Sequence, residues 1–275
     1  MTKIYGVIGD PIEHSISPQM HNAAFSALKM KCTYLAFCVS RDELQTFMEG
    51  AKDAKIFGLN VTVPLKEEVM KFVKPDRMAK KIGAVNTIDF TTGKGYNTDA
   101  IGAKKALEHG GVRVHNKNIL LLGAGGAARA IAFQLVQDGA VLTIANRTEK
   151  RAKGLAKEVG CSAGSLRNIK NLAAKADIII NSTPVGMYPD VNKSVIKKDA
   201  LLAEHTVFDI VYNPAETRLI KDAKSVGART INGVMMLVHQ GAESFRIWTS
   251  RDPPLRIMEN AVRKVLNDYR FKKTM

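Results

Sequence analysis

Three short polar clusters in the first hundred residues hold side chains that could bind a small anion. The hydroxyls of Ser15 and Ser17 alternate just before a proline at which a helix is expected to begin. A helix N-terminus with free hydroxyls is a natural cradle for a carboxylate, because its unpaired N–H groups and its dipole favour negative charge. Asn60 and Thr62 lie two residues apart in an expected strand, so their side chains share one face and point toward one site.

The clusters also supply charged groups. Lys66 ends the second cluster, and Asp99 ends the third, which also contains the neutral amide of Asn86. Taken singly, each residue has an ordinary explanation, since Ser17 and Thr98 suit helix caps and Lys66 is one of 41 basic residues. All three clusters fall where a strand is expected to meet a loop or a helix.

A glycine-rich turn in the middle of the chain matches a dinucleotide-binding fingerprint. Gly123-x-Gly125-x-x-Ala128 fits the GxGxxG/A pattern, with an apolar strand ending before it and a helix beginning inside it. The glycines allow a tight turn and let backbone N–H groups approach a pyrophosphate, and the helix N-terminus adds its positive dipole end. The alternative, a glycine-rich turn that serves only helix–strand packing, stays open.

The residues after the next strand favour one nicotinamide cofactor over the other. An NAD site usually offers an Asp or Glu about 20 residues on, to bind the ribose hydroxyl. Here that position holds Asn146-Arg147-Thr148, and no carboxylate precedes Glu149. Arg147 can bind a 2′-phosphate through charge-assisted hydrogen bonds, with Arg151 one helical turn later, and Thr148 also suits the N-cap of that helix. The sequence therefore predicts NADP rather than NAD.

The elements that must position these residues alternate between strand and helix, which is typical of an α/β layer structure. In the first third, helices are expected after Ser17-Pro18, after Ser40 with Glu43 in capping-box spacing, and after Pro64. Apolar runs predict the strands 3–8, 33–39, 56–62 and 84–90.

A second unit begins near Thr98, with a helix that ends at Gly110-Gly111. After Gly233 the pattern is helical to the end, so the terminal helices, which have no strands of their own, are expected to pack on the first domain. Between these points the apolar runs predict the strands 118–122, 141–145, 177–181 and 206–211.

Composition limits the class of protein. The 275 residues carry 41 Lys and Arg against 26 Asp and Glu, a net charge of +15 that favours anionic partners. The basic residues are scattered and not interleaved with aromatics, so no nucleic-acid partner is expected. Three cysteines without a CxxC pair fit a reducing, cytoplasmic setting. Neither a signal peptide nor a long apolar stretch is found, so no membrane association is expected.

Taken together, the motifs closely resemble the shikimate dehydrogenase family. They follow the family's order from residue 9 to about residue 245, and only roughly the last 25 residues carry no motif. The first half of the resemblance rests on Gly9–Pro18, Asn60–Lys66, Gly83–Thr87 and Asn97–Asp99. The second half rests on Gly123–Ala127, Asn146–Thr148, Asn181–Met187, Asp209–Pro214, Asn232–Gly233 and Met236–Ala242.

The resemblance implies a reversible, NADPH-dependent reduction of 3-dehydroshikimate to shikimate, a step of aromatic amino-acid biosynthesis. It implies an α/β fold with an N-terminal α/β substrate domain, residues 1–98 with 234–275, and a Rossmann-type doubly wound NADP-binding domain, residues 99–233. The active site would lie in the cleft between these domains, and the protein would be a monomer or a homodimer.

The resemblance also implies residue roles. Lys66 and Asp99 would be the catalytic pair beside the reacting carbonyl. The substrate carboxylate would be held by Ser15, Ser17 and Tyr212, and the rest of the substrate would be bound by Asn60, Thr62, Asn86 and Gln240. The cofactor would be bound by Gly123, Ala124, Gly125, Gly126, Ala127, Asn146, Arg147, Thr148, Arg151, Thr183, Ile210, Gly233 and Met236.

The chemistry of hydride transfer agrees with these roles. A hydride delivered to a ketone leaves alkoxide charge, which an ammonium can stabilise and protonate while a neighbouring carboxylate orients it. Either Lys66 or Asp99 could carry the proton, because strongly interacting groups titrate as a pair. No metal is expected, since His14 and His21 lack a third ligand nearby.

Two other functions stay open. A quinate or quinate/shikimate dehydrogenase with broader substrate or NAD use would share these motifs, although Ser17 favours shikimate because family members that prefer quinate often differ there. A catalytically inactive NADP-binding sensor is the second, and the intact Lys66 and Asp99 argue against it.

Overall fold

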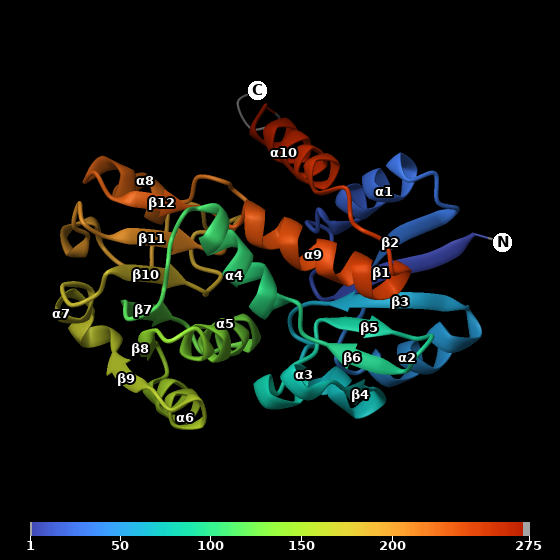
Figure 1. Ribbon diagram of the computed structural model, residues 1–275, viewed down its shortest axis with the longest axis horizontal. Coiled ribbons are helices and arrows are strands. Elements are labelled where there is room, and N and C mark those ends of the chain that lie inside the picture. Colours follow the sequence, from blue (N-terminus) through green and yellow to red (C-terminus); the bar gives the residue numbers. More distant parts are fainter. Residues whose placement is uncertain (1, 272–275) are drawn as a thin grey trace. The chain divides into compact units, whose positions relative to one another are not determined.

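The computed structural model describes residues 2–271 and divides the chain into two compact units. Unit 1 comprises the chain up to Asp99 together with the chain from Val238 onward, and unit 2 comprises Ala100–Leu237. Both units are built on a six-stranded sheet, and the fold is mixed α/β, as predicted (Figure 1).

The sheet of unit 1 has the strand order β2-β1-β3-β5-β6-β4. Strand β1 is parallel to both of its neighbours, whereas β5 is antiparallel to β3 and to β6. The strands are β1 (Lys3–Gly9), β2 (Cys32–Cys38), β3 (Ile56–Val61), β4 (Lys74–Pro75), β5 (Thr87–Asp89) and β6 (Lys94–Tyr96). The helices are α1 (Ser17–Ala27), α2 (Leu44–Asp53), the 3₁₀ helix η1 (Glu68–Phe72) and α3 (Arg77–Ile82).

Alternation along the strands gives this sheet two different faces. On one face Ile8, Leu59 and Val61 form an aliphatic core with residues of α2, such as Met48. On the other face Tyr5 packs against aromatic rings from α1 and α9, including Phe25 and Trp248, whose ring centroids lie 5.4 and 5.2 Å away. The aromatic face also carries the polar residues of the site.

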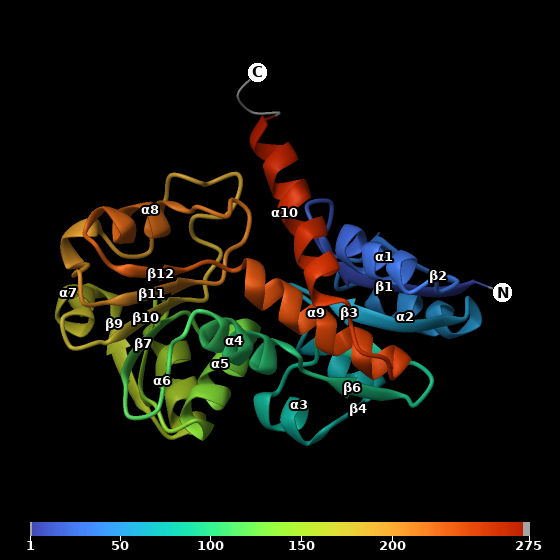
Figure 2. The same ribbon diagram turned by 45° about the horizontal axis from the view of Figure 1, so that its top comes forward.

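The last two helices are α9 (Val234–Thr249) and α10 (Leu255–Phe271), and from Gly233 to residue 271 the structure describes no strand, as predicted. Helix α9 starts at the end of unit 2 and enters unit 1 at Val238. Within unit 1, α10 packs against α1, which both ribbon views show (Figure 2). From Val238 onward the terminal helices thus belong to unit 1, whereas the first residues of α9 belong to unit 2.

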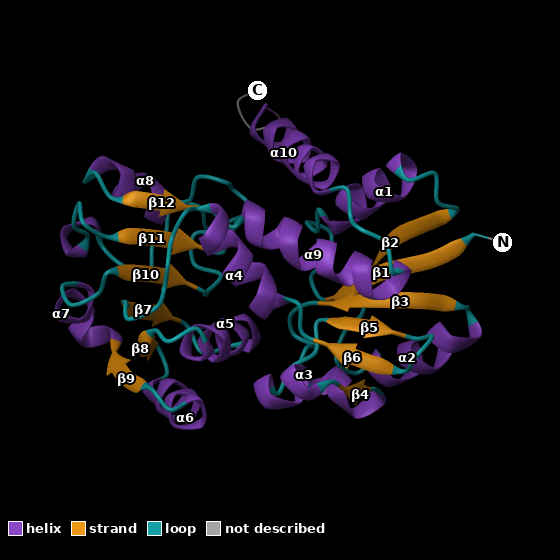
Figure 3. Ribbon diagram, in the orientation of Figure 1, coloured by secondary structure: helices purple, strands orange, loops and turns teal. Residues whose placement is uncertain are grey.

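The sheet of unit 2 is parallel throughout, with the order β12-β11-β10-β7-β8-β9 (Figure 3). The chain starts at the central β7, moves outward through β8 to β9, and then returns to β10 beside β7. This is the doubly wound Rossmann order, which places a ligand site where the winding reverses. The strands are β7 (Asn118–Leu122), β8 (Val141–Asn146), β9 (Ser162–Ser165), β10 (Ile178–Asn181), β11 (Thr206–Asp209) and β12 (Arg229–Ile231).

Helices of unit 2 cover its sheet. Residues of α7 and α8 form one core with Leu120 and Leu122, and Leu121 faces the opposite side because side chains alternate. Helix α5 packs on β7 and β8 and against α6. The helices are α4 (Asp99–His109), α5 (Gly126–Gln137), α6 (Glu149–Val159), η2 (Leu166–Asn168), α7 (Ile169–Ala173), η3 (Lys198–Ala200) and α8 (Arg218–Ser225).

Several local predictions differ from the structure. Ser17 is the first residue of α1 rather than its cap: Ile16 is the N-cap, and the Ser15 hydroxyl accepts the Ser17 N–H at 3.4 Å. The helix expected after Pro64 is only η1, and the strand 84–90 is reduced to β5. Glu43 accepts hydrogen bonds from the Ser40 N–H and hydroxyl at 2.9 and 2.7 Å, but the helix starts later, at Leu44.

No helix within residues 2–271 is both long enough and apolar enough to cross a bilayer.

His21, on α1, is a buried titratable group in the aromatic face of unit 1. Its ring is fully buried and stacks on Tyr34, with the ring centroids 4.4 Å apart and the planes inclined by 7°. Neither ring nitrogen has a hydrogen-bond partner among the described residues. Burial lowers the pKa of His21 from 6.5 to about 3, so the folded protein holds it neutral.

This burial predicts a loss of stability in acid. Between pH 6.5 and about 3 the unfolded chain binds a proton at His21 that the folded chain does not, so the stability falls as the pH falls. At pH 5 the loss from this residue is about 2 kcal/mol relative to pH 7.5. Urea denaturation of wild type and His21→Phe at both pH values should show this difference in wild type only; equal pH dependence in both proteins would contradict the assignment.

Candidate active site

The central feature of unit 1 is an ion pair between Lys66 and Asp99. Lys66 lies in the segment between β3 and η1, and Asp99 is the first residue of α4. Lys66 Nζ lies 2.5 Å from Asp99 Oδ2, and the two side chains are only 15% and 8% exposed. An ammonium and a carboxylate at this distance form a short charge-assisted hydrogen bond.

Asn86 fixes the other oxygen of the carboxylate. Its Nδ2 donates to Asp99 Oδ1 at 2.9 Å and to Thr98 Oγ1 at 3.0 Å, while its Oδ1 accepts the Thr98 backbone N–H at 2.7 Å. This accepted bond decides which way the amide faces, because only a carbonyl oxygen can receive the N–H. The donor end of Asn86 therefore points at Asp99.

Behind Asn86 lies a buried network of hydroxyls and amides, which we call the polar network: Tyr34, Asn60, Thr87 and Ser244. Thr87 Oγ1 donates to Asn86 Oδ1 at 3.0 Å and lies 2.8 Å from Ser244 Oγ. Asn60 Nδ2 donates to Ser244 Oγ at 2.9 Å and to Thr87 Oγ1 at 3.1 Å. The Tyr34 hydroxyl donates to Asn60 Oδ1 at 2.7 Å. All four side chains are buried, so each depends on these partners.

The network begins at Tyr34, beside α1. The Tyr34 ring stacks on His21 of α1, and burial raises the pKa of its phenol well above the usual value. Side-chain hydrogen bonds thus connect Tyr34 to Asp99 and Lys66 within unit 1.

The structure places the other predicted substrate residues as follows. Asn60 is only 6% exposed and its amide is engaged by the polar network, so it supports the site from behind. Thr62 lies just beyond β3 and is half-buried, as is Ser15 ahead of α1. Gln240 is on α9, where its backbone carbonyl oxygen accepts a hydrogen bond from the Ser244 hydroxyl at 3.0 Å. Tyr212 belongs to unit 2, in the half-buried segment after β11.

In unit 2 the glycine-rich turn has the conformation that its fingerprint requires. Gly123 follows β7 with φ of 122°, and a Cβ there would lie 2.5 Å from Ser182 Oγ. Helix α5 begins at Gly126, and no atom lies within 4 Å of a Cβ built at Gly125. Backbone N–H groups at the start of α5, around Ala124 and Ala127, are thus open to an anionic group such as a pyrophosphate.

The turn after β8 carries the predicted 2′-phosphate residues. Asn146 ends β8 and its Nδ2 donates to the Thr148 carbonyl at 3.2 Å. Thr148 is the N-cap of α6, although its side chain makes no cap hydrogen bond. Arg147 and Arg151 are exposed. An open pocket of about 470 Å³ lies here, lined by Asn146, Arg147, Glu149, Ser165, Leu166 and Arg167.

A second buried network holds the loops after β10 and β11. Asp209 Oδ1 accepts Asn181 Nδ2 at 2.9 Å, and its Oδ2 accepts the Thr217 hydroxyl at 2.6 Å. Asn181 Oδ1 accepts the N–H and hydroxyl of Thr183 at 3.0 and 2.7 Å. Burial raises the pKa of Asp209 to about 6, although the hydrogen bonds that it accepts act in the opposite direction. The network therefore fixes the loop that carries Thr183 and the strand end before Ile210.

Gly233 directly precedes α9 and Met236 lies in its first turn; both belong to unit 2 and both are buried. A Cβ at Gly233 would lie 2.0 Å from the carbonyl oxygen of Ile210, so only glycine allows the two segments this close approach. The predicted cofactor residues Ile210 and Gly233 are thereby adjacent.

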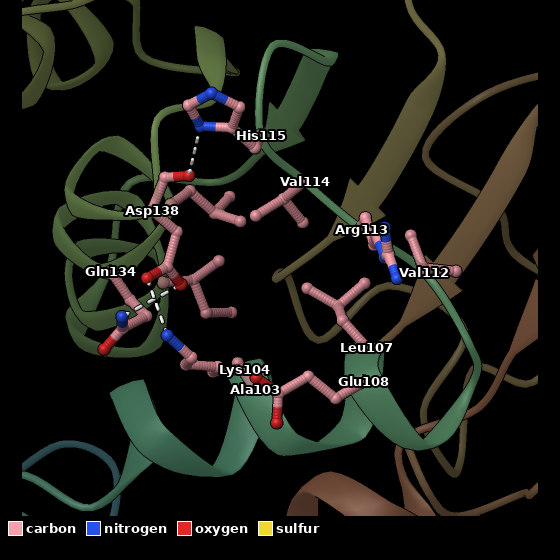
Figure 4. A pocket seen from close by; sticks show the side chains of 12 residues that line it. Ala103, Lys104, Leu107, Glu108, Val112, Arg113, Val114, His115, Gln134 and Asp138 are labelled. Carbon is pink, nitrogen blue, oxygen red and sulfur yellow. Dashed lines mark hydrogen bonds and ion pairs between the residues drawn. The ribbon is translucent and has the colours of Figure 1, made fainter.

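Unit 2 has another cavity, of about 280 Å³, between α4, the segment 112–115 and α5 (Figure 4). It contains no predicted site residue. Its Lys104 and Asp138 are paired with each other at 2.7 Å, and Gln134 donates to the same carboxylate at 3.0 Å. Within the part of the chain that is described, no group of three or more His, Cys, Asp and Glu side chains could hold a metal ion.

The sequence analysis assigned no site role to Tyr34, Thr87, Ser244, Ser165 or Arg167. Thr87 directly follows Asn86, and Ser244 lies one helical turn after Gln240, so local spacing could have indicated both. Tyr34 and Arg167 reach their sites only through strand pairing, for which the sequence carries no local signal.

Comparison with known proteins agrees with this geometry. Residues 7–88 match the shikimate dehydrogenase substrate binding domain, residues 103–218 match shikimate / quinate 5-dehydrogenase, and residues 233–263 match the shikimate 5′-dehydrogenase C-terminal domain. The shikimate dehydrogenase (NADP(+)) of Methanococcoides burtonii is 52% identical over 269 residues, which is 97% of this chain and 100% of that protein.

Solved structures are similar over the same span. A shikimate dehydrogenase in complex with NADP⁺ superposes with a TM-score of 0.92 at 45% identity, covering 96% of each chain. The Thermus thermophilus enzyme in complex with NADP(H) and shikimate has a TM-score of 0.89 at 36% identity, covering 96% of this chain and 99% of that one. The chain therefore belongs to the shikimate dehydrogenase (NADP⁺) family.

Proposed function

We propose that this protein catalyses the reversible, NADPH-dependent reduction of 3-dehydroshikimate to shikimate in aromatic amino-acid biosynthesis. The observation that carries the proposal is the Lys66–Asp99 pair, with 2.5 Å between Nζ and Oδ2 and little exposure of either side chain. A proton donor held this firmly is what reduction of a ketone requires beside its carbonyl oxygen.

The chain's own residues perform the acid–base part of the reaction. The bound cofactor would supply or accept the hydride at its nicotinamide ring. In reduction, Lys66 Nζ stabilises and protonates the oxygen on which negative charge develops, and Asp99 keeps the ammonium in place. In oxidation the same pair takes the hydroxyl proton. Because the two groups are so close, they act as one acid–base unit.

Substrate binding is assigned to hydroxyl, phenol and amide groups. Ser15 and Ser17 would donate to the carboxylate at the N-terminus of α1, with Tyr212 as a third donor. Ring hydroxyls would be bound by Thr62, Asn86 and Gln240. Asn60 acts behind this shell, since its amide is engaged by Tyr34 and Ser244.

Cofactor binding is assigned to unit 2. Gly123–Ala127 would hold the pyrophosphate at the open N-terminus of α5. Asn146, Arg147, Thr148 and Arg151 would bind the adenosine end with its 2′-phosphate. The nicotinamide end would lie near Thr183, Ile210, Gly233 and Met236, where the Asp209 network fixes the backbone.

We further assign residues 1–98 with 234–275 to substrate binding and residues 99–233 to NADP binding. The three cysteines are free thiols, which suits a reducing compartment such as the cytoplasm. The enzyme is proposed to act as a monomer or a homodimer.

The proposal is tested by initial rates of NADP⁺ reduction at 340 nm with shikimate, run beside quinate and NAD⁺. We expect fast turnover only with shikimate and NADP⁺. Comparable rates with quinate or NAD⁺ would assign the protein to the quinate/shikimate branch instead. Absence of turnover with every pair would favour an NADP-binding sensor.

The role of Lys66 is tested by Lys66→Ala, with the exposed Lys71→Ala as the matched control. Loss of the ammonium should lower kcat roughly a hundredfold or more, the usual scale for a general acid–base group, while shikimate binding stays measurable by calorimetry. Lys71→Ala should keep the wild-type rate. A kcat near the wild-type value in Lys66→Ala would remove Lys66 from the mechanism.

A further inference from the structure

The pocket at the end of β8 has a second wall, built by β9. The two strands are parallel and in register, with Asn146 opposite Ser165, so both end at the same edge of the sheet. Arg147 follows the first strand directly, and Arg167 lies two residues beyond the second. Both arginines line the pocket and both are exposed, so each guanidinium is accessible to a ligand.

Ser165 connects the two walls through its hydroxyl group. Ser165 Oγ donates to Glu149 Oε1 at 2.6 Å and accepts the backbone N–H of Arg167 at 3.2 Å. The bond to Ser165, helped by the nearby charges of Lys153 and Arg167, lowers the pKa of Glu149. The one carboxylate that lines this pocket is therefore ionised and tied to the β9 wall.

The carboxylate of Glu149 matters because a free carboxylate at this position would favour NAD over NADP. A free Glu at this edge of a Rossmann sheet accepts hydrogen bonds from the ribose hydroxyls of NAD, and it repels a 2′-phosphate. Ser165 occupies one oxygen of Glu149, and Arg167 supplies positive charge beside it. What remains open to a ligand is a pair of guanidinium groups on two adjacent loops.

We propose that Arg167 is a 2′-phosphate ligand in addition to Arg147 and Arg151, and that Ser165 excludes Glu149 from the cofactor. The inference rests on the proposed function and extends it from the turn after β8 to the turn after β9. A phosphate offers several strong acceptor oxygens, and the planar fork of each guanidinium suits two of them. Two arginines can thus bind one 2′-phosphate from different sides.

A competing role for Arg167 is that it only neutralises Glu149 and never touches the ligand. The two roles give different results when Glu149 is made neutral. If Arg167 contacts the phosphate, its removal from the Glu149→Gln protein still lowers the affinity of that protein for the phosphate. If Arg167 only neutralises Glu149, its removal from the Glu149→Gln protein leaves the affinity unchanged.

The experiment is calorimetric titration of wild type, Arg167→Ala, Glu149→Gln and the double variant with adenosine 2′,5′-bisphosphate and with 5′-AMP. Arg147→Ala is the positive reference, and Lys170→Ala, an exposed cation of α7 paired with Asp199, is the matched control. These readouts need no turnover, so they stay informative if the proposed reaction is wrong. Thermal melts establish that each variant is folded.

We expect Arg167→Ala to lower the affinity for the bisphosphate roughly tenfold or more, both in the wild-type protein and in Glu149→Gln. The affinity for 5′-AMP should fall less than twofold. Lys170→Ala should change neither affinity. Equal losses for both ligands, or a loss that disappears in the Glu149→Gln background, would overturn the proposal. So would a wild-type protein that binds the two ligands equally well.

Ser165→Ala tests the second half of the inference by kinetics. Release of the Glu149 carboxylate should lower the preference for NADPH over NADH, measured as the ratio of kcat/KM values, by roughly tenfold. Ser165→Thr, which keeps the hydroxyl, should restore the preference. An unchanged ratio in a folded Ser165→Ala protein would overturn the role assigned to Ser165.

Discussion

The Lys66–Asp99 ion pair is the interaction on which the rest of unit 1 depends. Moving two charges mostly out of water is costly unless both find close partners, and here the side chains are 15% and 8% exposed. The cost is offset by the 2.5 Å contact itself and by Asn86, which donates to the second carboxylate oxygen. A pair held by such partners has one geometry, which is what a catalytic proton donor needs.

Asn86 is in turn oriented by a polar network embedded in an aromatic layer. Amide and hydroxyl donors follow one another from Tyr34 through Asn60 and Thr87 to Asn86, each donating toward the carboxylate of Asp99. Bonds arranged head to tail polarise one another, and buried polar groups leave few alternative conformations. The chain of bonds thus runs from Tyr34, whose ring stacks on His21 of α1, to the proposed catalytic pair.

Much of this organisation could be predicted from the sequence, for identifiable reasons. The fold of unit 2 could be predicted because β7, β8, β10 and β11 are apolar runs and a glycine fingerprint follows β7. Strand β9 reads Ser-Ala-Gly-Ser, without apolar periodicity, so neither the strand nor Arg167 beyond it could be placed. The position of Thr87 directly after Asn86 could indicate that it lies near the site, but not that it orients Asn86, because that role depends on the pairing of β3 with β5 and on the contact with Ser244 of α9.

The central claim is that buried hydrogen bonds set the geometry of the proposed catalytic pair, Lys66 and Asp99. Thr87→Val tests it most directly, because Thr87 is fully buried and valine keeps its shape while removing the hydroxyl. The account predicts a kcat lowered roughly tenfold with a displaced pH profile, little change in the shikimate KM, and recovery in Thr87→Ser. A folded Thr87→Val protein with the wild-type kcat and pH profile would contradict it.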